Sequence, residues 1–230
     1  RFAPPSGNYR WVEPWGAPLR VMHWVAALAI LVLIVTGFYI GRPYFMTTGA
    51  PPQYLMGYIR LIHYVAAGVF VMTGLVRFYW LFAGNQFERL PALFPVRKRD
   101  WVNLVTQVKY YLMIHPERAP HYIGHNPLQQ LSYTTTYVVS IVVMITGFAM
   151  YGQAAPGGFF YTITQPLTLA VGGIQVVRLV HHLCVWWFII FPIMHIYLVI
   201  RKEVTERGGG LSGIVNGGHY IRADKQYVDE

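Results

Sequence analysis

The chain has 230 residues, of which 55% are hydrophobic and only 12% are charged. A soluble domain carries about 25% charged residues, so this composition excludes an ordinary soluble globule and also a disordered chain. The net charge is +9, but the basic residues lie between long apolar runs. This arrangement favours a membrane over a nucleic acid as the binding partner. The single cysteine, Cys184, excludes an internal disulfide and an iron–sulfur cluster bound by this chain alone.

Gaps between charged residues predict four membrane-spanning helices, because about 20 apolar residues are needed to cross the hydrocarbon core. Such runs occupy about residues 21–41, 58–82, 128–151 and 174–200. Residues 152–173 are rich in Gly, Pro and Thr and predict a loop. Within the polar loop 83–127, residues 101–113 form either an interfacial helix or a solvated linker. The predicted fold class is all-α, an integral membrane four-helix bundle in which residues 1–230 form a single domain.

The basic residues predict the orientation, because cytoplasmic segments of membrane proteins are enriched in Lys and Arg. With four spans, the N-terminus, the loop 83–127 and the tail 201–230 share one side. That side carries 14 of the 18 Lys and Arg residues, the other side carries Arg42, Arg60 and Arg178, and Arg77 lies within a span. Both termini are therefore expected in the cytoplasm.

Four histidines within the predicted spans are candidate site residues, because a polar side chain there is costly and tends to be functional. They are His23, His63, His181 and His195. Residues 14 apart on a helix share a face and lie about 21 Å apart, which fits His181 and His195 but not His182. By depth, His23 matches His195 at the cytoplasmic level. His63 matches His181 at the outer level, so two haems could each be held by a pair of axial histidines.

Other interpretations of the histidines remain open. They could be hydrogen-bonded polar residues in a bundle core, or they could line a metal or proton transporter. A transporter would usually place acidic residues within the membrane, and the four predicted spans contain none. A haem-free membrane anchor for a peripheral enzyme is a further possibility, although it gives no reason for two pairs matched in depth.

The interval of 14 residues recurs at two more positions. Arg77 follows His63 by this interval and would either pair with a haem propionate or extend to the interface. Gly37 follows His23 and would either let a flat macrocycle approach the backbone or serve helix packing. The dipeptide Thr-Gly occurs in three spans, at residues 36–37, 73–74 and 146–147, and helix packing alone could explain it.

The remaining polar histidines lie outside the predicted spans. They are His115, His121, His125 and His219. Each could contact a quinone head group, but solvated surface histidines are the simpler expectation.

Several segments together resemble the b-type cytochrome subunit of membrane-bound nickel–iron hydrogenases. The matching segments are APLRVMHW at residues 17–24, MGYIRLIH at 56–63, RFYW at 77–80, GHNP at 124–127, ITGFA at 145–149 and HIY at 195–197. The similarity extends over about residues 15–222, and MGYIR together with GHNP is its most specific part.

The resemblance implies a four-helix cytochrome with two haem b groups. Its axial ligands fall on His23, His63, His181 and His195. Arg77 and Gly37, from their spacing, and Arg20 are the other residues expected beside the haems. It implies an electron carrier of the bacterial inner membrane that connects a periplasmic hydrogenase with quinone, at a quinone site that the sequence does not assign. The expected partners are lipid, the iron–sulfur small subunit and, through it, the large subunit, which activates hydrogen. A haem subunit of formate dehydrogenase or thiosulfate reductase is the alternative.

Overall fold

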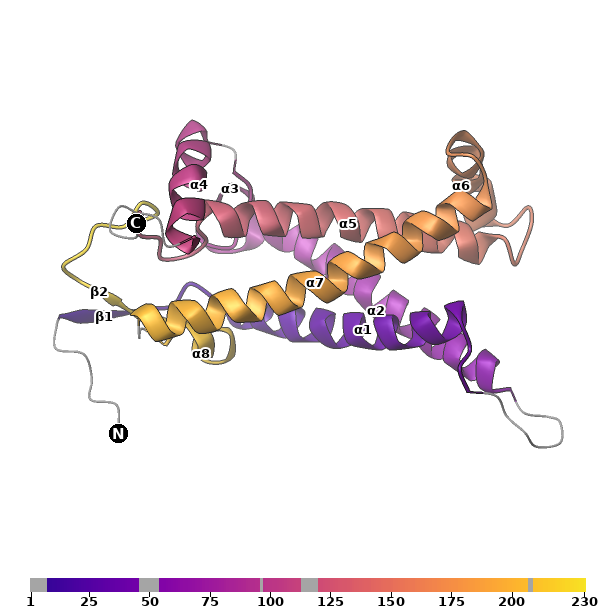
Figure 1. The fold of residues 1–230 in the computed structure, drawn as a ribbon, viewed down its shortest axis with the longest axis horizontal. Helices are drawn as coiled ribbons and strands as arrows, with labels where there is room; N and C mark the ends of the chain where they lie inside the picture. The colour runs from indigo at the N-terminus through magenta and orange to yellow at the C-terminus, as the bar shows by residue number, and fades with distance from the viewer. Residues whose placement is uncertain (1–7, 46–53, 96, 113–119, 207–208) are drawn as a thin grey trace. The chain divides into compact units, whose positions relative to one another are not determined.

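The computed structural model describes residues 8–45, 54–95, 97–112, 120–206 and 209–230. These residues form helices and one small two-stranded sheet (Figure 1). In chain order the elements are β1 (Tyr9–Val12), α1 (Ala17–Gly41), α2 (Leu55–Ala83), α3 (Leu90–Leu93), α4 (Lys98–Tyr111), α5 (Pro127–Gly152), α6 (Phe159–Ala170), α7 (Ile174–Glu206), α8 (Gly210–Asn216) and β2 (His219–Arg222).

Four of these helices, α1, α2, α5 and α7, are long and apolar enough to cross a membrane. Each contains one of the predicted spans, so the mostly helical fold and its four membrane-length helices are confirmed (Figure 1). Large apolar side chains on them point outward: Leu28 is 63% exposed, Phe78 62% and Ile193 64%. Lipid rather than water is the solvent that suits such a surface.

The chain packs as two compact units. Unit 1 comprises Arg1–Val21, Arg77–Thr136 and Phe191–Glu230, and unit 2 comprises Met22–Val76 and Tyr137–Ile190. The single domain over residues 1–230 stays a prediction.

In unit 1, the arm before α1 pairs with the tail after α8. Strands β1 and β2 are antiparallel, with Val12 opposite His219. The backbone N–H of Trp15 donates to the carbonyl of Gly217 at 3.1 Å and extends this pairing. A small apolar core joins the arm, the loop and the tail. Its buried members are Phe87, Ile123 and Ile221.

The tail also fixes the loop before α5. The carboxylate of Asp229 accepts the backbone N–H groups of Ile123 at 2.8 Å and Gly124 at 2.7 Å. One residue earlier, Val228 N–H donates to the carbonyl of His121 at 3.0 Å. Because backbone N–H groups of a buried loop need acceptors, these bonds account for the ordered path of the GHNP segment.

The same segment starts α5. Asn126 accepts the N–H of Gln129 at 3.0 Å, and the Gln129 side chain accepts the N–H of Asn126 at 2.9 Å. This is a reciprocal helix cap, and Pro127 occupies the first helical position, where no N–H is needed.

A buried carboxylate connects α2 with the start of α1. Glu88 is 1% exposed, and its Oε1 accepts the N–H of Gly16 at 2.6 Å. Its Oε2 accepts the indole N–H of Trp80 at 2.8 Å and the N–H of Asn85 at 3.3 Å. A buried carboxylate is tolerated when donors surround it in this way.

The structure corrects one sequence expectation and decides another. Residues 152–173 are not a loop throughout, because they contain α6. The glycines of this segment lie at its two ends: Gly158 is the N-cap of α6, and Gly172 and Gly173 follow the helix at φ +102° and +96°. Residues 159–170 contain no glycine, which allows a helix there. For residues 101–113 the sequence left open a helix or a linker, and the structure shows a helix, α4, over Lys98–Tyr111.

Candidate functional site

His63 lies on α2 against the Thr36–Gly37 dipeptide of α1, within unit 2. The Nδ1 atom of His63 is 2.8 Å from Thr36 Oγ1. A Cβ atom at Gly37 would lie 3.5 Å from Cε1 of the same ring. The two adjacent residues therefore contact one edge of the imidazole, one by a hydrogen bond and the other by leaving space.

His181 on α7 has the same surroundings, also within unit 2. Its Nδ1 atom is 3.0 Å from Thr146 Oγ1 on α5, and a Cβ atom at Gly147 would lie 3.4 Å from its Cε1. His63 and His181 both belong to unit 2. The structure thus brings His63 and His181 together in one unit, each with a Thr-Gly dipeptide at its Nδ1 edge.

His23 and His195 belong to different units, so each is described separately. His23 lies on α1, and its ring meets that of Trp24 edge-on, with centroids 5.2 Å apart. His195 lies on α7 and stacks on Phe191, with centroids 5.6 Å apart. Both are half-buried. Their pairing stays a prediction.

The two arginines assigned to the haems are in unit 1. Arg77 is only 9% exposed, and its Nη2 donates to the carbonyl of Glu88 at 3.1 Å. Arg20 is half-buried, and its Nη1 donates to the carbonyl of Val215. Gly217 lies next to this guanidinium, with a Cβ position 3.4 Å from Arg20 Cζ. Contact of either arginine with a haem stays a prediction.

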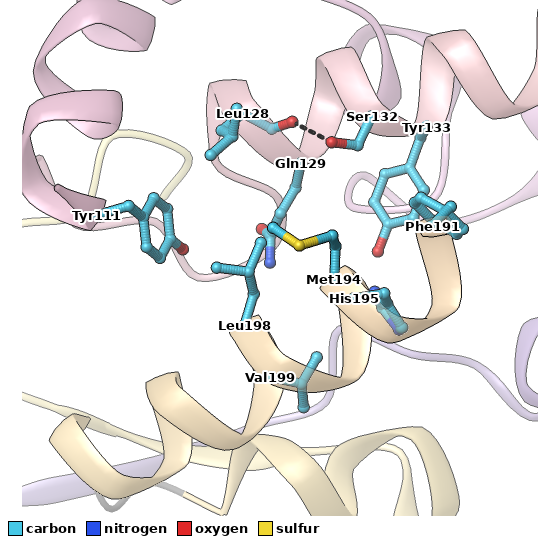
Figure 2. A pocket seen from close by; sticks show the side chains of 10 residues that line it. All are labelled: Tyr111, Leu128, Gln129, Ser132, Tyr133, Phe191, Met194, His195, Leu198 and Val199. Carbon is cyan, nitrogen blue, oxygen red and sulfur yellow. Dashed lines mark hydrogen bonds between the residues drawn. The ribbon is translucent and has the colours of Figure 1, made fainter. Parts of the chain in front are cut away.

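A pocket opens beside His195 within unit 1 (Figure 2). Residues of α4, the first turns of α5 and the second half of α7 line it. They are Tyr111, Leu128, Gln129, Ser132, Tyr133, Phe191, Met194, His195, Leu198 and Val199. Figure 2 shows the Tyr133 and His195 side chains on the same side of the pocket, while Ser132 donates to its own helix at Leu128 O, 2.9 Å away. The pocket is therefore mostly apolar with a few polar groups, as small-molecule sites usually are.

The sequence matches the family described as prokaryotic cytochrome b561 over residues 14–217. The chain belongs to this family. A multi-pass membrane protein with b-type haem is what this membership and the four membrane-length helices imply.

This cytochrome b561 chain is also similar to curated proteins named as probable Ni/Fe-hydrogenase B-type cytochrome subunits. It is 41% identical to that of Azotobacter chroococcum mcd 1 over 93% of this chain and 90% of the relative. It is 41% identical to that of Cupriavidus necator over 87% and 84% of the two chains. Its identity to the Ni/Fe-hydrogenase 1 B-type cytochrome subunit of Escherichia coli K12 is 35% over 87% of each. The resemblance seen in the sequence motifs is confirmed.

The residues of unit 2 fit the haem of a cytochrome b561. An imidazole binds iron through one ring nitrogen while the other usually makes a hydrogen bond that orients the ring. His63 and His181 each have Nδ1 beside a threonine hydroxyl, which leaves Nε2 for the iron. The adjacent glycines, Gly37 and Gly147, keep one edge of each ring free of a side chain.

Two buried histidines of the cytochrome b561 chain were expected to be solvated, and this expectation is wrong. His125 is 9% exposed and His219 is 5% exposed. His125 lies between the rings of Trp15, at a centroid distance of 4.7 Å, and Tyr133, at 4.9 Å. Trp15 belongs to the arm before α1, so the burial of His125 depends on a contact between residues far apart in the sequence, which local sequence does not indicate. His121 is half-buried, and His115 lies outside the described residues.

Burial changes the protonation of both imidazoles. Burial, with smaller effects of Arg77, Lys202 and His195, lowers the pKa of His125 from 6.5 to about 3. Burial, followed by the charge of Lys202, lowers the pKa of His219 from 6.5 to about 4. Both side chains are therefore neutral in the folded protein at pH 7.

We expect acid to destabilise unit 1 through His219. Between pH 6.5 and about 4 the unfolded chain binds a proton at His219 that the folded chain does not. The free energy of unfolding is therefore unaffected by His219 above pH 6.5 and decreases as the pH falls toward 4. Thermal unfolding of the purified protein at pH 7.5, 6.0 and 5.0 measures this. His219→Gln should make the acid slope shallower, while the part of the slope that His125 contributes remains. Equal slopes for wild type and His219→Gln would contradict the assignment.

Proposed function

We propose that this chain is the di-haem membrane subunit that carries electrons from a nickel–iron hydrogenase to the quinone pool. The observation that supports it best is the pair His63 and His181, two half-buried imidazoles in one membrane unit with the same hydrogen-bond pattern at Nδ1. The hydrogenase partner is suggested by the names of relatives that are 35–41% identical over most of the chain.

In this proposal, His63 and His181 bind the outer haem iron, and His23 and His195 bind the cytoplasmic one. Bound haem b supplies one-electron chemistry, with a potential set by its ligands and surroundings. Arg77 and Arg20 neutralise propionate charge, which is costly away from water. Gly37 leaves space for the macrocycle.

The proposed orientation places both termini in the cytoplasm of a bacterium, with the chain in the inner membrane. It rests on the distribution of basic residues, 14 of 18 on one side. The hydrogenase then lies on the periplasmic side, where its iron–sulfur small subunit contacts this chain and the large subunit activates hydrogen. With one cysteine, this chain itself cannot bind a cluster through four thiolates.

The pocket beside His195 suits the head group of a quinone. A neutral quinone needs an apolar slot and one or two hydrogen-bond donors at its carbonyl oxygens. Leu198 and Met194 provide apolar walls and Tyr133 carries a hydroxyl group, whereas the Ser132 hydroxyl already donates to the carbonyl of Leu128 (Figure 2). Because His195 lines the pocket, a head group bound here would lie beside a proposed iron ligand.

The test is reduction by hydrogen of the complex purified with its hydrogenase. We expect hydrogen to produce a reduced b-type spectrum with about two haems per chain, and added quinone to reverse it. Absence of bound haem would contradict the proposal and leave the transporter or the haem-free anchor. If hydrogen does not reduce the haems but a formate dehydrogenase or thiosulfate reductase partner does exchange electrons with them, the chain belongs to the alternative complex.

A further inference from the structure

The hydrogen bonds of Thr36 and Thr146 determine where their hydroxyl protons lie. A threonine hydroxyl has one proton and can donate only one strong bond. Thr36 Oγ1 lies 2.7 Å from the carbonyl of Val32, and Thr146 Oγ1 lies 2.7 Å from the carbonyl of Val142. Each hydroxyl therefore donates to the backbone one turn earlier on its own helix, as threonines in membrane helices often do.

With its proton used in this way, each threonine oxygen can only accept from the imidazole next to it. The contacts are 2.8 Å from Thr36 Oγ1 to His63 Nδ1 and 3.0 Å from Thr146 Oγ1 to His181 Nδ1. The donor in both contacts must then be Nδ1–H. A neutral imidazole has a single N–H, so Nε2 of both rings carries the lone pair.

We propose that Thr36 and Thr146 are positioning residues that select the Nδ1–H tautomer of His63 and His181, so that both rings present Nε2 to one haem iron. This inference rests on the proposed role of the two histidines as iron ligands. It assigns to two threonines a function that packing alone does not require.

The location of the bonds makes the selection effective. Thr36 is 6% exposed and Thr146 is 9% exposed, and both lie within membrane-length helices. Water cannot replace a lost bond there, so an imidazole with its proton on Nε2 would lose its partner at Nδ1 and could not bind iron. A hydrogen bond from Nδ1–H also makes the ligand more basic, which favours ferric iron and lowers the midpoint potential.

The third Thr-Gly dipeptide supplies a control within the same chain. Thr73 on α2 donates to the carbonyl of Val69 at 2.8 Å, the same bond that the other two threonines make. Among the described residues, and apart from the backbone of α2 itself and the two chain neighbours, nothing lies within 4 Å of a Cβ position at Gly74, so no ring packs against this glycine. Loss of the Thr73 hydroxyl should therefore affect a helix but not a haem.

The experiment compares Thr36→Val, Thr146→Val, Thr36→Ser and Thr73→Val in the purified complex. Valine keeps the size of threonine and removes the acceptor. We expect each of the first two variants to weaken retention of one haem by about 10- to 100-fold and to raise its midpoint potential, while the second haem is unchanged. The electron paramagnetic resonance signal of that ferric haem should shift in both. Thr36→Ser should restore wild-type behaviour, and Thr73→Val should equal wild type.

Two results would overturn the inference. One is wild-type retention, potential and spectrum in both valine variants. The other is a Thr36→Ser protein that behaves like Thr36→Val, since packing would then be the role of the residue. A wild-type protein without haem, or valine variants that perturb two different haems, would contradict the proposed ligands instead, so the two failures can be told apart.

Discussion

Replacing His63 by leucine should remove one of two haems, and replacing His181 by leucine should remove the same one. In the proposal two imidazoles would hold each iron, and leucine offers no ligand atom, so one of the two ligands would be lost. The haem content should fall from about two to about one per chain, and the surviving spectrum should be identical in the two variants. Electron transfer from hydrogen to quinone should fall to background, because one of its two carriers is absent.

The matched control is His182→Gln, on the same helix as His181 and one residue later. The His182 side chain is exposed, and its Nδ1 lies 2.7 Å from the carbonyl of Arg178 on its own helix. This variant should keep both haems. If the His63 and His181 variants lost different haems, the pairing of these two histidines would be wrong. If His182→Gln lost a haem, the spacing argument that selected His181 over His182 as the ligand would be wrong.

Replacing Glu88 by glutamine should give the largest loss of stability in unit 1. The buried carboxylate accepts from Gly16 N–H and Trp80 Nε1–H through different oxygens. An amide can present its oxygen to only one of them and must direct an NH₂ group at the other. One buried donor then loses its acceptor and meets a second donor, which costs about 2–3 kcal/mol. The unfolding midpoint should fall by about 4–12 °C.

Glu13→Gln is the corresponding control, because Glu13 also accepts from an indole N–H. Its Oε1 lies 2.9 Å from Trp11 Nε1, but both side chains are exposed. Water can replace that bond, so the midpoint should change by less than about 2 °C. Differential scanning calorimetry or tryptophan fluorescence of the two proteins in detergent measures the difference. Equal midpoints for Glu88→Gln and Glu13→Gln would refute the structural role of the buried carboxylate.

The long helices could be predicted from the sequence because the signal is local. An uncharged apolar run such as residues 21–41 must cross a membrane or be buried, and a helix alone satisfies its backbone there. Helical periodicity likewise predicts that His181 and His195 share a face of α7, and this stays a prediction. Helix α6 was missed because glycine at its two ends, at residues 157–158 and 172–173, biased the composition of the whole segment.

The role of the Thr-Gly dipeptides could be noticed but not assigned from sequence. All three have the same local pattern, and only contacts between helices separate them. Thr36 reaches an imidazole 27 residues away and Thr146 one 35 residues away, while Thr73 reaches none among the described residues. The burial of His125 was likewise beyond prediction, because it depends on Trp15, which lies more than 100 residues earlier in the chain.

The bonds between Asp229 and the backbone of Ile123 and Gly124 can form only late in the synthesis of the chain. They join positions 106 and 105 residues apart, and the later partner emerges from the ribosome only after all four long helices have been made. Unit 1 therefore cannot make these two bonds before Asp229 has emerged, and until then the N–H groups of Ile123 and Gly124 lack these acceptors.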